Sequence, residues 1–221
     1  MTPLTSIIFK DIAVEWRNKE SLSSMCMFGV LTMVIFNYAF DPTGMDRSLI
    51  SPGILWVSFT FAGVIGLNRS LSMELDNDCM QGLLLSPLSR GDLYLGKVAS
   101  NFAFMMMAEL VIFPAFVVFN NLGISMALPE ILGIAVLGTL GFVSIGTILS
   151  MISAHTRMKE VILAVLQIPL TIPVLLMSVS ATRMVMSGET EGISARLSIL
   201  GAFSIVYLTA SYLLFEYVVE D

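Results

Sequence analysis

Between two long apolar runs the chain reads NRSLSMELDNDCMQGLLLSPLSRGDLYLGK, from Asn68 to Lys97. The stretch holds seven charged side chains, so it cannot lie inside a bilayer, where each buried charge costs several kcal/mol. It also carries three consecutive leucines, Leu83, Leu84 and Leu85. A short polar loop with an apolar ridge, held between two membrane spans, predicts a docking element for another protein.

The composition is that of an integral membrane protein. Of the 221 residues, 56% are hydrophobic and 13% are charged, whereas soluble domains carry about 25% charged residues. The mean hydropathy is +0.88. The net charge of -6 argues against nucleic acid as a partner. Because several charged residues precede the first apolar run, we expect no cleavable signal. Cys26 and Cys79 show neither a disulfide framework nor metal-ligand spacing.

Six apolar runs are each long enough, or nearly so, to cross a ~30 Å core, which needs about 20 helical residues. They lie at residues 22–40, 50–67, 98–119, 126–152, 161–180 and 197–215. The sequence therefore predicts an all-α integral membrane protein with one permease-like domain over residues 1–221.

The segment 4–20 precedes these runs and predicts an amphipathic helix. Leu4, Ile8, Ile12 and Trp16 fall on one side at 100° per residue, although Ile7 and Val14 interrupt the opposite, polar side. Such a helix can lie in the membrane interface. Packing of this helix on the protein's own spans is an equal alternative.

The basic residues set the predicted orientation. Eight of the 11 lie on one side of the predicted spans, namely Lys10, Arg17, Lys19, Arg69, Arg90, Lys97, Arg157 and Lys159; Arg47, Arg183 and Arg196 lie on the other. Because cytoplasmic loops are enriched in Lys and Arg, both termini and the loop 68–97 are expected in the cytoplasm.

Two features concern packing within the membrane. Small residues recur at four-residue spacing, as Ser58, Ala62 and Gly66 in the second run and as Gly146, Ser150 and Ala154 in the fourth. Such stripes allow close helix contacts, either within one chain or across a homodimer, and contacts within one chain are the commoner outcome.

Pro169 and Pro173 are expected to kink or break the fifth run.

Few residues suggest chemistry. Glu109 lies near the middle of the third run and is either a substrate-path or proton-linked group, or a protonated or hydrogen-bonded glutamate that holds helices together. His155 is the only histidine and has no second metal ligand at helical spacing, so no metal site is expected. No phosphate-cradling glycine motif or zinc motif occurs. We therefore expect no enzyme activity, and any ATP must bind another chain.

The loop resembles a known family. Glu74-x-Asp76, then the segment from Gly82 to Arg90 and Tyr94-Leu95-Gly96-Lys97, is similar to the heme exporter protein B, or CcmB, family of ABC-2 type permease subunits in cytochrome c maturation. The likeness extends to the length, the six spans and the first helix. Asp78 departs from it, because the family commonly has glycine just after the acidic cluster.

The resemblance implies that the loop docks onto an ATPase. Residues 79–86 would form a short coupling helix anchored by Leu83 and Leu84, with Asp92 capping the helix that follows. The implied coupling residues are Glu74, Gly82, Leu83, Leu84, Leu85, Pro87, Arg90, Gly96 and Lys97. His155, Arg157 and Lys159 would form a secondary cytoplasmic contact.

The family also implies a function and partners. The chain would be the permease subunit of an ATP-driven complex in the bacterial inner membrane that exports haem or releases a haem-loaded chaperone. Its partners would be an ABC ATPase (CcmA-like), a haem-handling membrane protein (CcmC-like), a single-span protein (CcmD-like) and the chaperone (CcmE-like). ATP would bind the ATPase and haem would be handled by the complex, with no cofactor on this chain. The alternative is an ABC-2 exporter of a lipid, drug or glycan. A secondary transporter fits less well, since there is one membrane carboxylate and no internal repeat.

Overall fold

The computed structural model of the protein describes residues 3–40, 47–76, 89–120, 128–153, 159–189 and 191–218. These residues form seven helices and no strands. The helices are α1 (Pro3–Asn18), α2 (Glu20–Ala39), α3 (Arg47–Asp76), α5 (Arg90–Phe119), α6 (Leu128–Ser153), α7 (Lys159–Ser187) and α8 (Ile193–Val218). Six of them, α2 to α8, are long and apolar enough to cross a membrane. This confirms the predicted all-α, six-span class.

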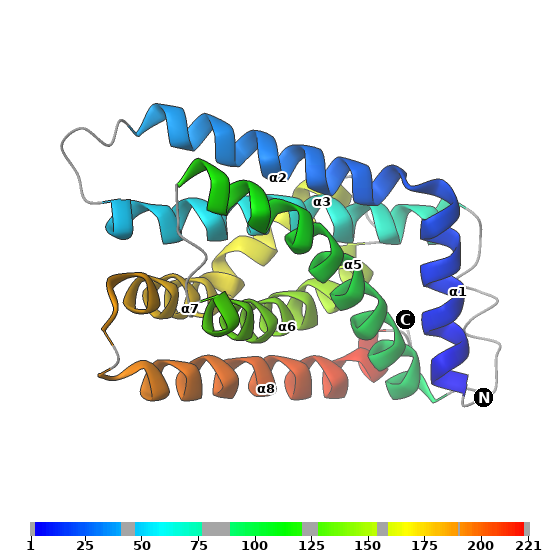
Figure 1. Ribbon diagram of the computed structural model, residues 1–221. Coiled ribbons are helices and arrows are strands. Elements are labelled where there is room, and N and C mark those ends of the chain that lie inside the picture. The colour runs from blue at the N-terminus through cyan, green and yellow to red at the C-terminus, as the bar shows by residue number, and fades with distance from the viewer. Residues whose placement is uncertain are drawn as a thin grey trace.

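The six long helices form one bundle (Figure 1). In this bundle α2 packs on α3, and α6 packs between α7 and α8. The start of α1 and the end of α8 lie at the same end of the bundle (Figure 1), as an even number of spans requires. We call this the predicted cytoplasmic end. α6 is the most enclosed of the six candidate spans, which agrees with its position among the other helices.

The first helix runs across the predicted cytoplasmic end and packs on α5 (Figure 1). Its buried contact residue is Ile7, with 4% of its surface exposed, whereas Phe9 is 62% exposed. α1 therefore packs on the protein's own spans, and it also keeps an exposed apolar side that suits the membrane interface. Ile7, which the periodicity placed on the polar side, is the residue that makes the contact.

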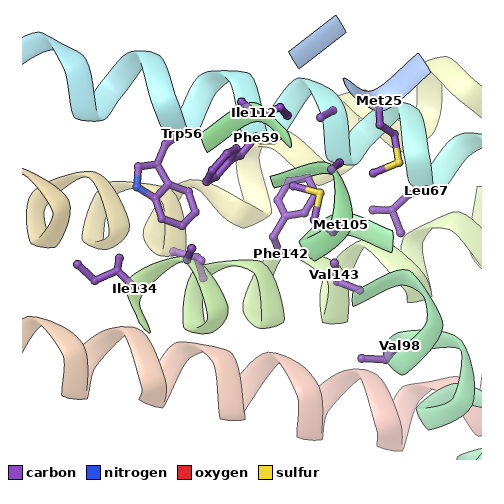
Figure 2. Packing of buried hydrophobic residues seen from close by; sticks show 14 of the residues in the cluster. Met25, Trp56, Phe59, Leu67, Val98, Met105, Ile112, Ile134, Phe142 and Val143 are labelled. Carbon is purple, nitrogen blue, oxygen red and sulfur yellow. The ribbon is translucent and has the colours of Figure 1, made fainter. Parts of the chain in front are cut away.

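The core combines aliphatic, aromatic and methionine side chains from all seven described helices. Figure 2 shows part of it, with Trp56 and Phe59 on α3 and with Phe142 of α6 next to Met105 of α5. Both of these side chains reach the backbone of α3 at Gly63, where a Cβ atom would collide with the Phe142 ring. The missing side chain of this glycine thus brings three helices together.

The small-residue stripe of the second span packs inside the chain. Ser58 and Ala62 are fully buried. A Cβ atom added at Gly66 would lie 2.6 Å from the Met25 sulfur, so the side chain of Met25 packs directly against this glycine. In the other stripe, Gly146 faces Leu67 and Gln167, and Ser150 is buried. Ala154 lies outside the described residues. The stripes whose contacts are described therefore serve intramolecular packing.

The prolines of the fifth span do not break it. α7 is continuous through Pro169 and Pro173. Two carbonyls beside the prolines also accept side-chain hydrogen bonds: the Tyr207 hydroxyl donates to the Leu170 carbonyl at 2.6 Å, and the Thr171 hydroxyl donates to the Gln167 carbonyl at 2.9 Å. Of the predicted kink or break, the break is contradicted, because the helix continues through both prolines.

Candidate functional site

The site predicted from sequence is the loop 68–97, of which the structure describes both ends. Glu74 lies in the last turn of α3, and α5 begins at Arg90. Residues 77–88, with Gly82, Leu83, Leu84, Leu85, Pro87 and the expected coupling helix 79–86, lie outside the described residues. So do His155 and Arg157 of the secondary contact, whereas Lys159 begins α7.

The second end of the loop is fixed by a helix cap. The backbone N–H of Asp92 donates to the Ser89 hydroxyl at 3.1 Å, and this hydroxyl donates to a carboxylate oxygen of Asp92 at 2.6 Å. Ser89 is therefore the N-cap, and Asp92 stands three residues inside it. The sequence had given the capping role to Asp92. Ser89, directly before the first helical residue, fits the capping role better because its side-chain oxygen reaches the backbone N–H of Asp92.

The first two turns of α5 are joined to α1. Nζ of Lys97 lies 2.9 Å from Oδ2 of Asp11, and only 5% and 11% of the two side chains are exposed. One turn away, Ile7 covers Gly96, so that a Cβ atom there would lie 3.1 Å from the Ile7 side chain. Hence Gly96 and Lys97 contact a helix of the same chain. Their predicted coupling role would act through α1.

The same turns of α5 are joined to the end of α8. Nη1 of Arg90 donates to the Glu216 carbonyl at 3.3 Å. Tyr212 of α8 lies so close to Gly91 that a Cβ atom there would overlap its ring, and the Tyr94 ring packs on Phe215 with centroids 5.3 Å apart. The end of the loop is thus attached to both terminal helices of the chain.

Glu109 is buried between α5 and α6, with 3% of its surface exposed. The Thr139 hydroxyl of α6 donates to its Oε1 at 2.5 Å, and its Oε2 has no hydrogen-bond partner within the described part of the chain. Two further polar links join these helices: the Tyr94 hydroxyl donates to the Ser144 carbonyl at 3.0 Å, and Asn101 donates to Thr147 at 3.1 Å. Glu109 therefore has the surroundings of a residue that holds two spans together.

Sequence reasoning missed three side chains of this region. Asp11 gave no signal of its own and Ile7 only interrupted the polar side of the predicted helix, because their partners lie in a distant segment. Gln167 is fully buried beside Gly146, with neither amide atom paired in the described part of the chain. A polar glutamine inside an otherwise apolar run is the sequence signal that could have identified this residue.

Among the described residues, no group of three His, Cys, Asp or Glu side chains could hold a metal ion.

Comparison with known proteins decides the family. The family model described as "CcmB protein" matches residues 2–219. The chain belongs to the CcmB family.

Curated CcmB relatives are similar over most of the chain. The heme exporter protein B of Bradyrhizobium diazoefficiens is 28% identical over 210 residues, covering 94% of this chain and 93% of the relative. That of Pseudomonas aeruginosa is 24% identical over 182 residues, covering 82% and 81%. That of Haemophilus influenzae is 22% identical over 209 residues, covering 93% and 91%. A CcmB-family chain with six candidate spans is a multi-pass membrane protein.

Proposed function

We propose that this chain is the membrane subunit of an ATP-driven haem-export complex for c-type cytochrome maturation. A separate ATPase delivers force through the loop 68–97. Membership of the CcmB family supports the proposal, as does the similarity to proteins named heme exporter protein B. The predicted orientation, in which this loop faces the cytoplasm where ATP is available, is consistent with it.

The observation that carries the coupling role is the attachment of the start of α5 to two other helices. A buried ion pair connects Lys97 to α1, and a hydrogen bond connects Arg90 to the end of α8. Because packed helices move as rigid bodies, a push on the loop displaces α1, α5 and α8 together. Glu74 and Lys159, at the ends of neighbouring helices, lie where the ATPase surface would meet the chain.

The chain acts by mechanical coupling and does not conduct haem. Haem iron is commonly held by histidine, and the only histidine, His155, lies between the fourth and fifth spans. The haem cargo is handled by partners: a haem-handling membrane protein, a small single-span protein and a haem chaperone on the outer face. ATP binds and is hydrolysed on the ATPase subunit, and the complex resides in the bacterial inner membrane.

A matched pair of loop variants tests this role. Leu83→Asp places a charge in the apolar ridge and should release the ATPase while the chain stays inserted. Leu122→Asp makes the same change in a loop predicted to lie on the opposite side and should retain the ATPase. The measurement is the amount of ATPase that copurifies with each tagged variant. Equal retention by both variants would contradict the coupling role.

A deletion strain separates this function from a general exporter. Loss of the chain should abolish c-type cytochromes, measured by haem staining of membrane proteins after denaturing electrophoresis. Normal c-type cytochromes in the deletion strain would instead favour a lipid, drug or glycan exporter.

A further inference from the structure

A groove of about 300 Å³ lies where α1, α2 and α5 meet, outside the coupling loop. Ile12 of α1, Leu22, Ser23 and Cys26 of α2, and Phe104 and Met107 of α5 line it together with Lys19, which stands between α1 and α2. Its volume falls at the lower end of the range for small-molecule sites, about 300–1,000 Å³. A space of this size accommodates a slender molecule and excludes a helix, which is about 10 Å wide.

The polarity of the groove changes along its length. Lys19 and Ser23 are exposed, whereas Cys26 and Met107 are half-buried and Phe104 is buried. From Lys19 to Cys26 the chain rises by roughly 10 Å, at 1.5 Å per residue, which is less than half of a ~30 Å hydrocarbon core. The groove thus runs from the predicted cytoplasmic surface into one leaflet, with its charged end at the surface.

The surroundings are those of a lipid-facing surface. Met27 of α2 is 69% exposed and Leu110 of α5 is 61% exposed, and both are neighbours of groove residues on their own helices. In a membrane these side chains contact acyl chains, so the molecules available to fill the groove are lipids. The groove is lined by a cationic side chain at its surface end and by apolar side chains deeper in the membrane. A phospholipid with an anionic headgroup has the complementary arrangement, with its charge at the surface and its acyl chains below.

Lys19 is the basic residue of the groove lining. It has a left-handed backbone (φ 50°), which turns the chain from α1 into α2, and no ion pair of Lys19 occurs within the described part of the chain. A basic side chain near a membrane surface attracts anionic lipid by about 1 kcal/mol, equivalent to about fivefold in affinity.

We propose that this groove binds one acyl chain of an anionic phospholipid in the cytoplasmic leaflet, with Lys19 at the headgroup phosphate. The bound lipid would be a structural ligand that fills the joint between the interfacial helix and the bundle. The proposal does not rest on the proposed ATPase coupling, because its evidence comes neither from the loop 68–97 nor from haem, although α1 and α5 belong to both.

The test is lipid retention by the full-length protein. The protein is reconstituted in nanodiscs of equal phosphatidylglycerol and phosphatidylcholine, released, and analysed by native mass spectrometry. Three variants accompany it. Lys19→Asn removes the charge and keeps a residue that tolerates a left-handed backbone. Cys26→Trp fills the groove. Met27→Trp is the matched control, which adds the same ring on the exposed side of the same helix.

We expect the unmodified chain and Met27→Trp to retain one phosphatidylglycerol about fivefold more often than phosphatidylcholine. Lys19→Asn should retain both lipids equally, and Cys26→Trp should retain neither, with helix content and thermal stability unchanged in Lys19→Asn. Equal retention of the two lipids by the unmodified chain would overturn the proposal, as would an unchanged preference in Lys19→Asn. Crosslinking of Cys26 to a partner polypeptide, in a Cys79→Ser background, would also overturn it.

Discussion

Lys97 of α5 forms an ion pair with Asp11 of α1, with 2.9 Å between Nζ and Oδ2, and both side chains are almost completely buried. The pair joins α1 to the end of the loop 68–97. Removal of one partner of a buried pair leaves an uncompensated charge, which costs about 3–5 kcal/mol. The pair is therefore a sensitive point at which to test how the loop is attached.

Substitution of one partner should weaken this attachment. Asp11→Asn should lower the thermal unfolding temperature in mild detergent and reduce c-type cytochrome content. Asp11→Asn combined with Lys97→Met should recover part of the stability, because no buried charge then remains. Lys10→Gln is the control: Lys10 lies 3.2 Å from the same carboxylate but is 43% exposed, and exposed pairs contribute about 1 kcal/mol or less. If Asp11→Asn destabilised the protein no more than Lys10→Gln, the buried pair would not hold α1 in place.

The second prediction concerns Glu109. Glu109→Gln should leave expression, thermal stability and c-type cytochrome content nearly unchanged, since an amide oxygen can accept the same hydrogen bond from Thr139. Thr139→Val should cost about 0.5–1.5 kcal/mol of stability through loss of that bond. A Glu109→Gln protein that is stable but inactive would show that the carboxylate itself takes part in transport.

The third prediction uses two glycines of α6. A Cβ atom at Gly138 would overlap the Trp56 ring and lie 2.7 Å from the Ser178 hydroxyl, whereas at Gly133 it would meet nothing within 4 Å. Gly138→Ala should therefore destabilise the protein by about 1–3 kcal/mol. Gly133→Ala should be neutral or stabilising by up to about 1 kcal/mol, because alanine is the better helix former. Thermal unfolding of the two variants compares them directly, and equal unfolding temperatures would be evidence against the described contact of α3 with α6.

The fourth prediction concerns the cap of α5. Ser89→Ala removes the acceptor of the Asp92 N–H and should cost about 1 kcal/mol, localised to the first turn. Amide hydrogen exchange of Asp92 and Leu93, whose N–H groups donate to Ser89, should accelerate about fivefold, which corresponds to that energy. Ser198→Ala, which removes an exposed serine hydroxyl bonded to its own helix, should leave this exchange unchanged. Unaltered exchange in Ser89→Ala would exclude the capping role.

The sequence predicted the spans well and the boundaries of α5 poorly. A long apolar run is the direct sequence signal of a membrane span, so the apolar runs alone identified all six candidate spans. The run at 98–119 omitted the first two turns of α5, because Arg90, Asp92 and Lys97 lower the local hydropathy. Lys97 and Arg90 find partners on α1 and α8, which a local pattern cannot reveal.

The contact face of α1 was missed for a similar reason. Ile7 and Ile8 are equally apolar, and periodicity chose the side with more apolar residues. The structure instead buries Ile7, because Gly96 leaves room for it on α5. Likewise, Pro169 and Pro173 predicted a kink or break, whereas α7 runs continuously through both prolines. A local sequence pattern does not reveal which partner a residue finds on another helix.

We propose that this chain couples an ATPase to c-type cytochrome maturation. Purification of the tagged chain in mild detergent tests this directly, with mass spectrometry and a haem absorption spectrum on the same sample. We expect to recover an ABC ATPase together with a haem-handling membrane protein and a haem signal. Recovery of an ATPase without haem and without those partners, or recovery of no ATPase at all, would contradict it.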